Sequence, residues 1–207
     1  MTELWTTLFS RWTRLLPGAD DVGRDLLERY GEAHRRYHDT EHLAEVLVAI
    51  DVLHRHASDP DAVRIAAWFH DAVYDPQRKD NEEESAHLAE SVLPGAGVAE
   101  SRISRVAALV RLTTTHDPAA SDVDGAVLSD ADLAVLASEP ERYARYASDV
   151  RAEYAFVPED AFRHGRLNVL EDLLSHGALF RTPTGHALWE ERARRNLTTE
   201  VALLRMA

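Results

Sequence analysis

The sequence predicts an all-α protein in the form of a helical bundle. Apolar residues recur at three- and four-residue spacing through most of the 207 positions. Turn signals such as Pro17-Gly18 and Asp75-Pro76 separate these runs. No segment has the alternation of a convincing strand, because the β-branched stretch 106–115 also keeps the apolar spacing of a helix.

The first half of the chain contains four predicted helices. Two apolar runs mark the first two: Leu4, Leu8, Trp12, Leu15 and Leu16, then Val22, Leu26, Leu27 and Tyr30. Thr40 is a good N-cap for the third, whose apolar face continues to Leu53. Asp59-Pro60 opens the fourth, since proline is favoured at the first helical position, and we expect this helix to carry His70-Asp71.

Six further helices are predicted beyond Asp75-Pro76, with boundaries good to about 2–4 residues. They lie at roughly 81–93, 98–115, 130–138, 140–154, 159–176 and 185–205. The last carries the apolar residues Leu197, Val201, Leu203 and Leu204. An apolar stripe of this kind usually packs against the protein's own core. The alternative is that it contacts a second copy of the chain in a homodimer.

The composition is that of a globular chain that can form one sizeable core. Hydrophobic residues make up 45% of it, with only 9 Gly and 8 Pro. We therefore expect a single domain over residues 1–207. Its parts are N-terminal helices over about 1–30, a core with the candidate site over about 36–155, and C-terminal helices over about 158–207.

Charge and cysteine content exclude several classes of function. A formal net charge of -13 opposes general nucleic-acid binding, because affinity for polyphosphate depends on Lys and Arg. No stretch has the apolar length of a membrane span, and the start lacks the pattern of a signal peptide, so we expect a cytoplasmic protein without a membrane partner. The absence of cysteine excludes disulfides and thiolate sites, so any metal would be held by His, Asp and Glu.

The dipeptide His70-Asp71 is the most informative feature of the chain. It lies in the stretch IAAWFHDAVY (65–74), where every other residue is apolar or aromatic. Burying an ionised carboxylate costs several kcal/mol or more unless it is paired or bound to a cation. Histidine and aspartate together offer nitrogen and oxygen ligands for a divalent metal, so a metal ion is the first candidate for compensation.

Two histidines, His38 and His42, precede this dipeptide in the chain. His42 falls early in the helix begun at Thr40, on the side of Val46, so its ring can face the core near His70-Asp71. His38 lies just outside the helix start and can reach the same site from the loop, which suits a proton donor. The alternatives are a surface pair at i, i+4 spacing, or a core histidine at position 42.

The order of these residues resembles the HD-domain superfamily of metal-dependent phosphohydrolases, which is named for the His-Asp doublet. His42 comes first, His70-Asp71 second, and an aspartate in LSDADL (128–133) third. Five segments further resemble a bacterial branch of predicted HD phosphohydrolases: YHDTEH (37–42), HDAVYD (70–75), DNEEESA (80–86), DADL (130–133) and VRAEY (150–154). The resemblance implies an HD-domain, phosphodiesterase-like helical bundle and names no substrate.

The resemblance also implies a ligand set and a general acid. One divalent metal ion (Mn, Co, Ni, Fe, Mg or Zn) would be held by four side chains, those of His42, His70, Asp71 and Asp130. The family pattern favours Asp130 over Asp132, since only one of two residues this close at a helix start can face the site; the alternative role for Asp130 is an N-cap. In cyclic-nucleotide phosphodiesterases a similar Tyr-His-Asn-x-x-His pattern uses its first histidine as general acid, which is His38 here.

Three acidic residues are candidates for the proton acceptor. Asp75 lies one helical turn after Asp71, where it can hydrogen-bond a water at the metal. Glu82 and Glu83 open the next predicted helix. There, acidic side chains also complement the helix dipole, so a solvated first turn is the alternative.

Candidate substrate-binding residues complete the predicted site. Arginine is the preferred residue for binding phosphate, because its planar guanidinium matches the phosphate oxygens. Six residues are selected: Arg36, Tyr37, His116, Arg151, Tyr154 and Arg166. An arginine on a charged helix more often forms a surface ion pair, which is the alternative for each of the three.

The predicted function is a metal-dependent phosphohydrolase that cleaves a phosphomonoester or phosphodiester of a small molecule, with a nucleotide favoured. The expected partner is thus a small phosphorylated substrate. Two other classes stay open, an HD-type di-iron oxygenase and a non-catalytic module that binds a nucleotide or a metal.

Overall fold

The computed structural model describes residues 2–206, and all regular secondary structure in that part of the chain is helical. This confirms the predicted all-α class. The α-helices in chain order are α1 (Glu3–Leu15), α2 (Asp20–Tyr30), α3 (Thr40–Leu53), α4 (Pro60–Phe69), α5 (Asn81–Val92), α6 (Glu100–Leu112), α7 (Val123–Asp132), α8 (Pro140–Glu153), α9 (Glu159–Ser175) and α10 (Pro183–Met206). Two 3₁₀ helices join them, η1 (His54–His56) and η2 (Leu133–Ala137).

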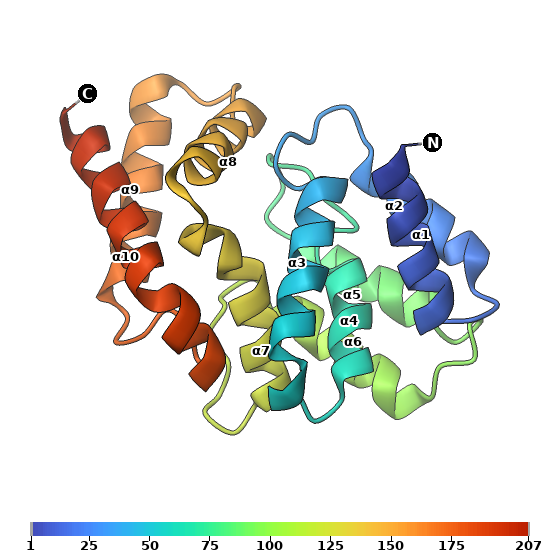
Figure 1. Ribbon diagram of the computed structural model, residues 1–207. Helices are drawn as coiled ribbons and strands as arrows, with labels where there is room; N and C mark the ends of the chain where they lie inside the picture. Colours follow the sequence, from blue (N-terminus) through green and yellow to red (C-terminus); the bar gives the residue numbers. More distant parts are fainter. Residues whose placement is uncertain (1, 207) are drawn as a thin grey trace.

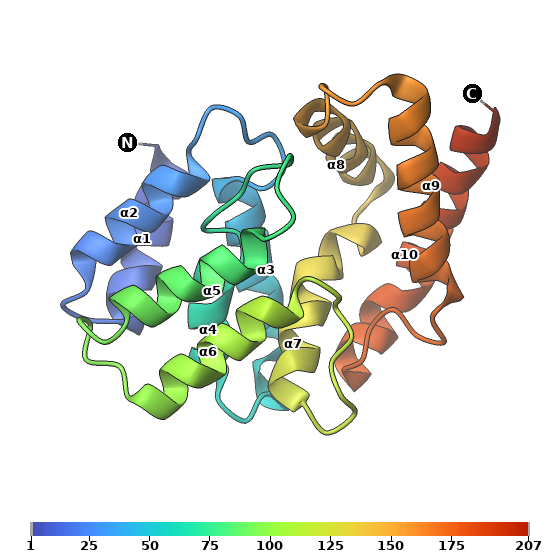
Figure 2. The ribbon, with the colours of Figure 1, turned by 180° about the vertical axis from the view of Figure 1, so that it is seen from behind.

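The helices form two groups with separate hydrophobic cores. Helices α1 to α7 lie on one side and α8 to α10 on the other, with the two chain ends on opposite sides of the molecule (Figure 1, Figure 2). The larger core includes Trp12 and Trp68, and the smaller includes Leu170 and Phe180. Trp189 of α10 packs against both, so the two cores are in contact.

The start of α3 differs by one residue from the prediction. Asp39, not Thr40, is the N-cap, since its carboxylate accepts hydrogen bonds from the backbone N–H groups of Glu41 and His42. A carboxylate satisfies N–H groups that have no partner within the helix, and it complements the helix dipole. This cap sets the position of His42 in the first turn, pointing inward.

Helix α4 ends before the His-Asp doublet, so the prediction that the doublet lies within this helix is wrong. Its last residue is Phe69, His70 forms the C-cap, and Asp71 begins the loop to α5. Carbonyl groups in the turn that follows the helix need donors of their own, because no ladder of secondary structure supplies them. The buried guanidinium of Arg35 donates to the carbonyl oxygens of Asp71 (2.7 Å) and Ala72 (3.3 Å), which holds the chain in this turn.

The helix expected at 130–138 also begins elsewhere. Helix α7 starts at Val123, where Asp122 is the N-cap and accepts from the N–H of Gly125 at 2.8 Å. It ends at Asp132 and continues as the 3₁₀ helix η2. Asp130 and Asp132 therefore lie in the last turn of a helix, where the prediction placed them at a helix start. Asp122, Asp124 and Gly125 are all common in turns, which explains why the start of α7 gave no helical signal.

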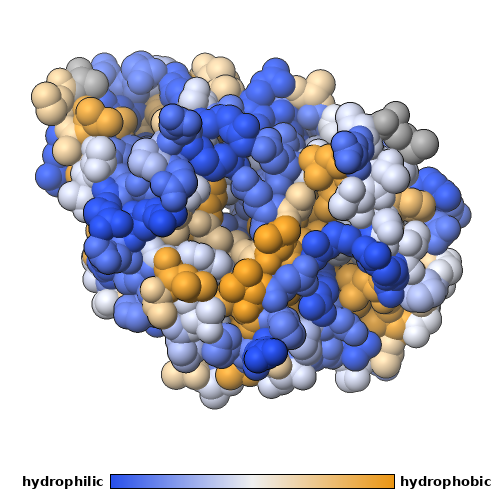
Figure 3. Space-filling model, viewed as in Figure 1, coloured by the Kyte–Doolittle hydropathy of each residue, from blue (hydrophilic) through white to orange (hydrophobic). Residues whose placement is uncertain are grey.

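Helix α10 covers the smaller core with Leu197 and Val201, whereas Leu203 is 62% exposed. No helix within residues 2–206 is long and apolar enough to cross a membrane. Apolar side chains are visible in a band across the middle of one face, over α3 (Figure 3). Val48 and Val52 of α3 are about half exposed and line a shallow groove with Trp189 of α10.

Candidate metal centre and adjoining cavities

Three side chains meet where α3, α4 and α7 pack together. His42 comes from the first turn of α3, His70 is the C-cap of α4, and Asp132 is the last residue of α7. Each offers one ligand atom, and these atoms all lie within 4.8 Å of one another. The histidines are buried, so the cluster is positioned by the packing of α3, α4 and α7.

The spacing of these atoms fits a single metal ion. Nε2 of His42 lies 3.2 Å from Nε2 of His70 and 3.2 Å from Oδ1 of Asp132, and the His70 to Asp132 distance is 3.6 Å. With metal–ligand bonds of about 2.1 Å, two ligand atoms are about 3.0 Å apart at a right angle and about 3.4 Å apart at a tetrahedral angle. The cluster could therefore hold a metal ion without rearrangement.

The other ring nitrogen of His70 supports the same role. Nδ1 lies 2.8 Å from the carbonyl oxygen of Ala67. Because a carbonyl only accepts, Nδ1 carries a hydrogen, so Nε2 is the nitrogen that would bind a metal ion in place of a proton. A backbone carbonyl that fixes the tautomer of a histidine in this way is typical of metal sites.

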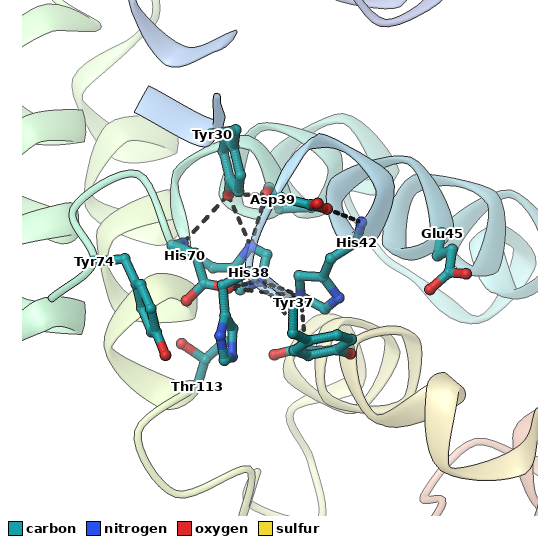
Figure 4. Close-up of polar contacts among 12 residues, drawn as sticks. Tyr30, Tyr37, His38, Asp39, His42, Glu45, His70, Tyr74 and Thr113 are labelled. Carbon is teal, nitrogen blue, oxygen red and sulfur yellow. Dashed lines mark hydrogen bonds and ion pairs between the residues drawn. The ribbon is translucent and has the colours of Figure 1, made fainter. Parts of the chain in front are cut away.

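Asp71 borders the cluster. Its Oδ2 lies 3.0 Å from Nε2 of His70 and 3.6 Å from Nε2 of His42. His70 of the doublet thus belongs to the cluster and Asp71 borders it, although the doublet lies in a turn. Figure 4 shows His70 beside His42 and His38.

The electrostatics of the cluster favour a positive charge at its centre. Burial lowers the pKa of His70, but Asp71, Tyr30 and Asp132 outweigh burial and place the pKa well above its usual value. Burial raises the pKa of Asp132, but His70 and His42 lower it well below its usual value. Paired carboxylates and imidazoles of this kind attract a proton or a metal ion to the same place.

The sequence-based choice between the two aspartates is corrected by the structure, which places Asp132 and not Asp130 with the histidines. Asp130 is fully buried and accepts three hydrogen bonds from the segment that leads into α10. The donors are the N–H of Arg181 (2.7 Å), the N–H of Thr182 (2.8 Å) and the hydroxyl of Thr182 (2.7 Å). Asp130 therefore anchors the start of α10.

His38 is held beside the cluster by Glu153, a residue for which the sequence predicted no role. Nδ1 of His38 donates to Oε2 of Glu153 at 2.7 Å, and the backbone N–H groups of residues 36–38 donate to Oε1. The hydroxyl of Tyr74 also donates to Oε2. Burial raises the pKa of Glu153, but the hydrogen bond from His38 and the backbone donors lower it to about 2. Glu153 falls within the VRAEY segment, which was the only sequence signal for it.

The cluster opens into a cavity of about 370 Å³. Seven residues predicted for the site line it: Tyr37, His38, His70, Asp71, Glu82, His116 and Tyr154. Asp132 lines it as well, together with two basic residues that the sequence analysis did not select, Arg78 and Lys79. Nε2 of His116 lies 3.7 Å from Oδ2 of Asp132, so His116 borders the cluster from the loop after α6.

Two of the predicted acidic residues do not line this cavity. The carboxylate of Asp75 accepts from the N–H of Gln77 at 2.9 Å and so stabilises the turn that follows the doublet. Glu83 is exposed, forms an ion pair with Arg111, and lies 2.9 Å from Nε2 of His87. Of the three candidate proton acceptors, Glu82 alone is among the lining residues.

The three predicted arginines also lie outside this cavity. Arg36 is exposed and only its backbone N–H reaches Glu153. Arg151 binds Glu159 and the carbonyl oxygens of residues 154 and 157. Both carboxylate oxygens of Glu200 accept from Arg166, which lines a second cavity.

This second cavity has a volume of about 420 Å³ and lies against α8 and α9. It shares Tyr37, His38, Tyr146 and Tyr154 with the first cavity. Its other lining residues are Val150, Val157, Ala161, Phe162, Gly165, Arg166 and Val169. The polar cavity at the cluster thus adjoins a mainly apolar one, and His38 lies at the boundary.

The chain was also compared with known proteins. No family model, no curated protein and no solved structure matches it. The function is therefore inferred from the side chains of the site.

Proposed function

We propose that the protein is a metal-dependent hydrolase of a small phosphate ester, such as a nucleotide. The observation that carries this proposal is the His42–His70–Asp132 cluster, which lies beside a histidine that is itself fixed by a buried carboxylate. Together they combine a candidate metal site with a candidate proton donor in one cavity.

The metal would be held by His42, His70 and Asp132, with Asp71 as a further oxygen ligand. A bound divalent ion supplies a Lewis acid for a phosphoryl oxygen and lowers the pKa of a water molecule. The set of imidazole and carboxylate ligands suits Mn, Co, Ni, Fe or Zn, and also Mg.

His38 would protonate the leaving oxygen of the ester. Glu153 occupies Nδ1, so Nε2 is the nitrogen that remains for a ligand. Burial lowers the pKa of His38, but Asp71 and Glu153 outweigh burial and raise it, which keeps the imidazole protonated to higher pH. A protonated histidine held in place by a carboxylate is suited to general acid catalysis.

Glu82 would accept a proton from the attacking water, and Lys79 would offset the negative charge of the phosphate. Glu82 is the candidate proton acceptor because it lines the cavity. Lys79 would offset phosphate charge, since it lines the same cavity, while Arg78 is held by both oxygens of Asp80. Arg151 and Arg166 are not needed in this role, because both are already bound to carboxylates.

The proposal is tested by the metal content of the purified protein, followed by a screen of phosphate esters with that metal. We expect about one metal ion per chain, with hydrolysis that is lost in His70→Ala. His87→Ala is the matched control, because His87 is exposed on α5 and pairs with Glu83 outside the cavity. Less than about one tenth of a metal ion per chain, without a gain on reconstitution, would contradict the proposal, since an intact site should exceed that occupancy.

A further inference from the structure

We infer that the second cavity, against α8 and α9, binds an uncharged aromatic ring carried by the leaving group of the substrate. This inference rests on the proposed function and adds the chemical class of the leaving group. Its basis is the position of His38, the apolar lining of the cavity and the neutralised charge of Arg166.

His38 determines on which side the leaving group lies. A general acid must contact the leaving oxygen, so the rest of the leaving group extends from His38 away from the metal. His38 lines both cavities, whereas His70, Asp71 and Asp132 line only the first. The second cavity is therefore the space that a leaving group would enter when the phosphate is at the cluster.

The lining of the second cavity selects an apolar group. Val150, Val157 and Phe162 contribute apolar walls. Tyr154 and Phe162 contribute two aromatic rings, whose centroids lie 6.2 Å apart at an angle of 44°. Flat, apolar walls favour an aromatic ring through burial and ring contacts.

Apart from His38 at the boundary, Arg166 is the one charged residue of the lining, and it does not make the cavity an anion site. The side chain of Arg166 is 9% exposed, and its guanidinium donates to both carboxylate oxygens of Glu200 and to the hydroxyl of Tyr146. Glu200 balances its charge, and three of its five N–H groups have partners within the protein. Beyond His38, which is paired with Glu153, a second phosphate would find no unpaired cation in this lining. An uncharged ring can pack beside Tyr146 and Arg166, whose Cζ lies 5.0 Å from the centroid of the Tyr146 ring.

Gly165 offers a direct test of this cavity. It lies within α9 and lines the cavity. Apart from its two chain neighbours and the nearby backbone of α9, no atom lies within 4 Å of the position that a Cβ would take. Gly165→Leu should fold, because leucine is a better helix former and meets no clash at its Cβ, and the larger side chain should fill the cavity. The control is Asn168→Leu, which adds the same side chain to an exposed position of α9 outside the cavity.

The experiment measures the binding of methylphosphonate and of 1-naphthylphosphonate to the metal-loaded protein by calorimetry. Both probes carry the same head group and a carbon–phosphorus bond that is not hydrolysed. We expect the naphthyl probe to bind roughly tenfold more tightly, from burial of its ring. In Gly165→Leu the ratio of the two affinities should fall to about one, and in Asn168→Leu it should stay as in the parent protein.

The outcomes separate this inference from the proposed function. Equal affinity for both probes, or a preference for the ring that survives in Gly165→Leu, would overturn the inference even if phosphate esters are hydrolysed. Ring-dependent binding that Gly165→Leu removes, in a protein that hydrolyses no ester, would keep the cavity and reject the hydrolase. If Gly165→Leu lowers kcat/KM, relative to the parent, more for 1-naphthyl phosphate than for methyl phosphate, both the inference and the proposed function are supported.

Discussion

Nδ1 of His38 and a carboxylate oxygen of Glu153 lie 2.7 Å apart, although 115 positions separate them in the chain. His38 belongs to the loop before α3, and Glu153 is the last residue of α8. The same carboxylate receives three backbone N–H groups from that loop. One buried side chain from the smaller group of helices thus positions the candidate general acid of the larger group.

Glu153→Gln should lower activity and change its pH dependence. The amide keeps the size of the side chain but loses the negative charge that helps to raise the pKa of His38. The alkaline limb of the pH profile of kcat/KM should therefore move to lower pH, because the imidazole loses its proton earlier. We expect a loss in rate of roughly 10- to 100-fold at neutral pH, within the usual range of general acid catalysis. Glu139→Gln, at an exposed position that pairs with Arg192, is the control; an unmoved alkaline limb in Glu153→Gln would contradict this role.

The same substitution should alter stability in acid. The pKa of Glu153 is about 2 in the folded protein against an ordinary 4.5, so the unfolded state binds more protons between these values. The stabilisation is complete above pH 4.5 and is lost as the pH falls toward 2, and it amounts to about 3 kcal/mol. The free energy of unfolding of the metal-free protein should fall less steeply over this interval in Glu153→Gln than in the parent. Identical slopes from urea unfolding would show that Glu153 is not the group responsible.

Most of the helices were predictable from the sequence, with α7 as the exception, whereas the partners of the site residues were not. A helix leaves a local signal, because its apolar stripe repeats every three to four residues. Asp130 and Asp132 are about 200° apart around α7, and the packing against α3 and α4 decides which of them faces the histidines. Arg35 and Glu153 bind groups 36 and 115 positions away, so no local spacing indicates their roles. His70-Asp71 was identifiable because its polarity conflicts with its immediate neighbours.

Arg35→Lys should destabilise the protein by about 2–3 kcal/mol. The guanidinium is fully buried and donates to the carbonyl oxygens of His38, Asp71 and Ala72. A lysine ammonium keeps the charge but lacks the planar guanidinium that reaches all three acceptors at once. Carbonyl groups that stay buried without a donor lower the free energy of unfolding. Urea unfolding at neutral pH measures the effect. Arg36→Lys is the matched control at the next, exposed position and should change stability by less than about 0.5 kcal/mol; equal effects of the two variants would argue against the proposed role of Arg35.

Asp132→Asn and Asp130→Asn should separate metal binding from folding. Asp132 contributes a carboxylate oxygen to the cluster, so its amide variant should stay folded and lose at least tenfold in metal affinity. Asp130 accepts from Arg181 and Thr182, and an amide there would turn a donor toward a backbone N–H group. Asp130→Asn should therefore keep its metal and lose about 1–3 kcal/mol of stability.

The two readouts are metal analysis after dialysis and urea unfolding in the presence of a chelator, which removes any contribution of bound metal to stability. Added metal should raise the unfolding midpoint of the parent and of Asp130→Asn, but not that of Asp132→Asn. The reverse pattern, with metal lost in Asp130→Asn and kept in Asp132→Asn, would mean that Asp130 is the ligand. In that case α7 would have to rotate to exchange the two carboxylates, and the three hydrogen bonds that now join Asp130 to the start of α10 would have to break.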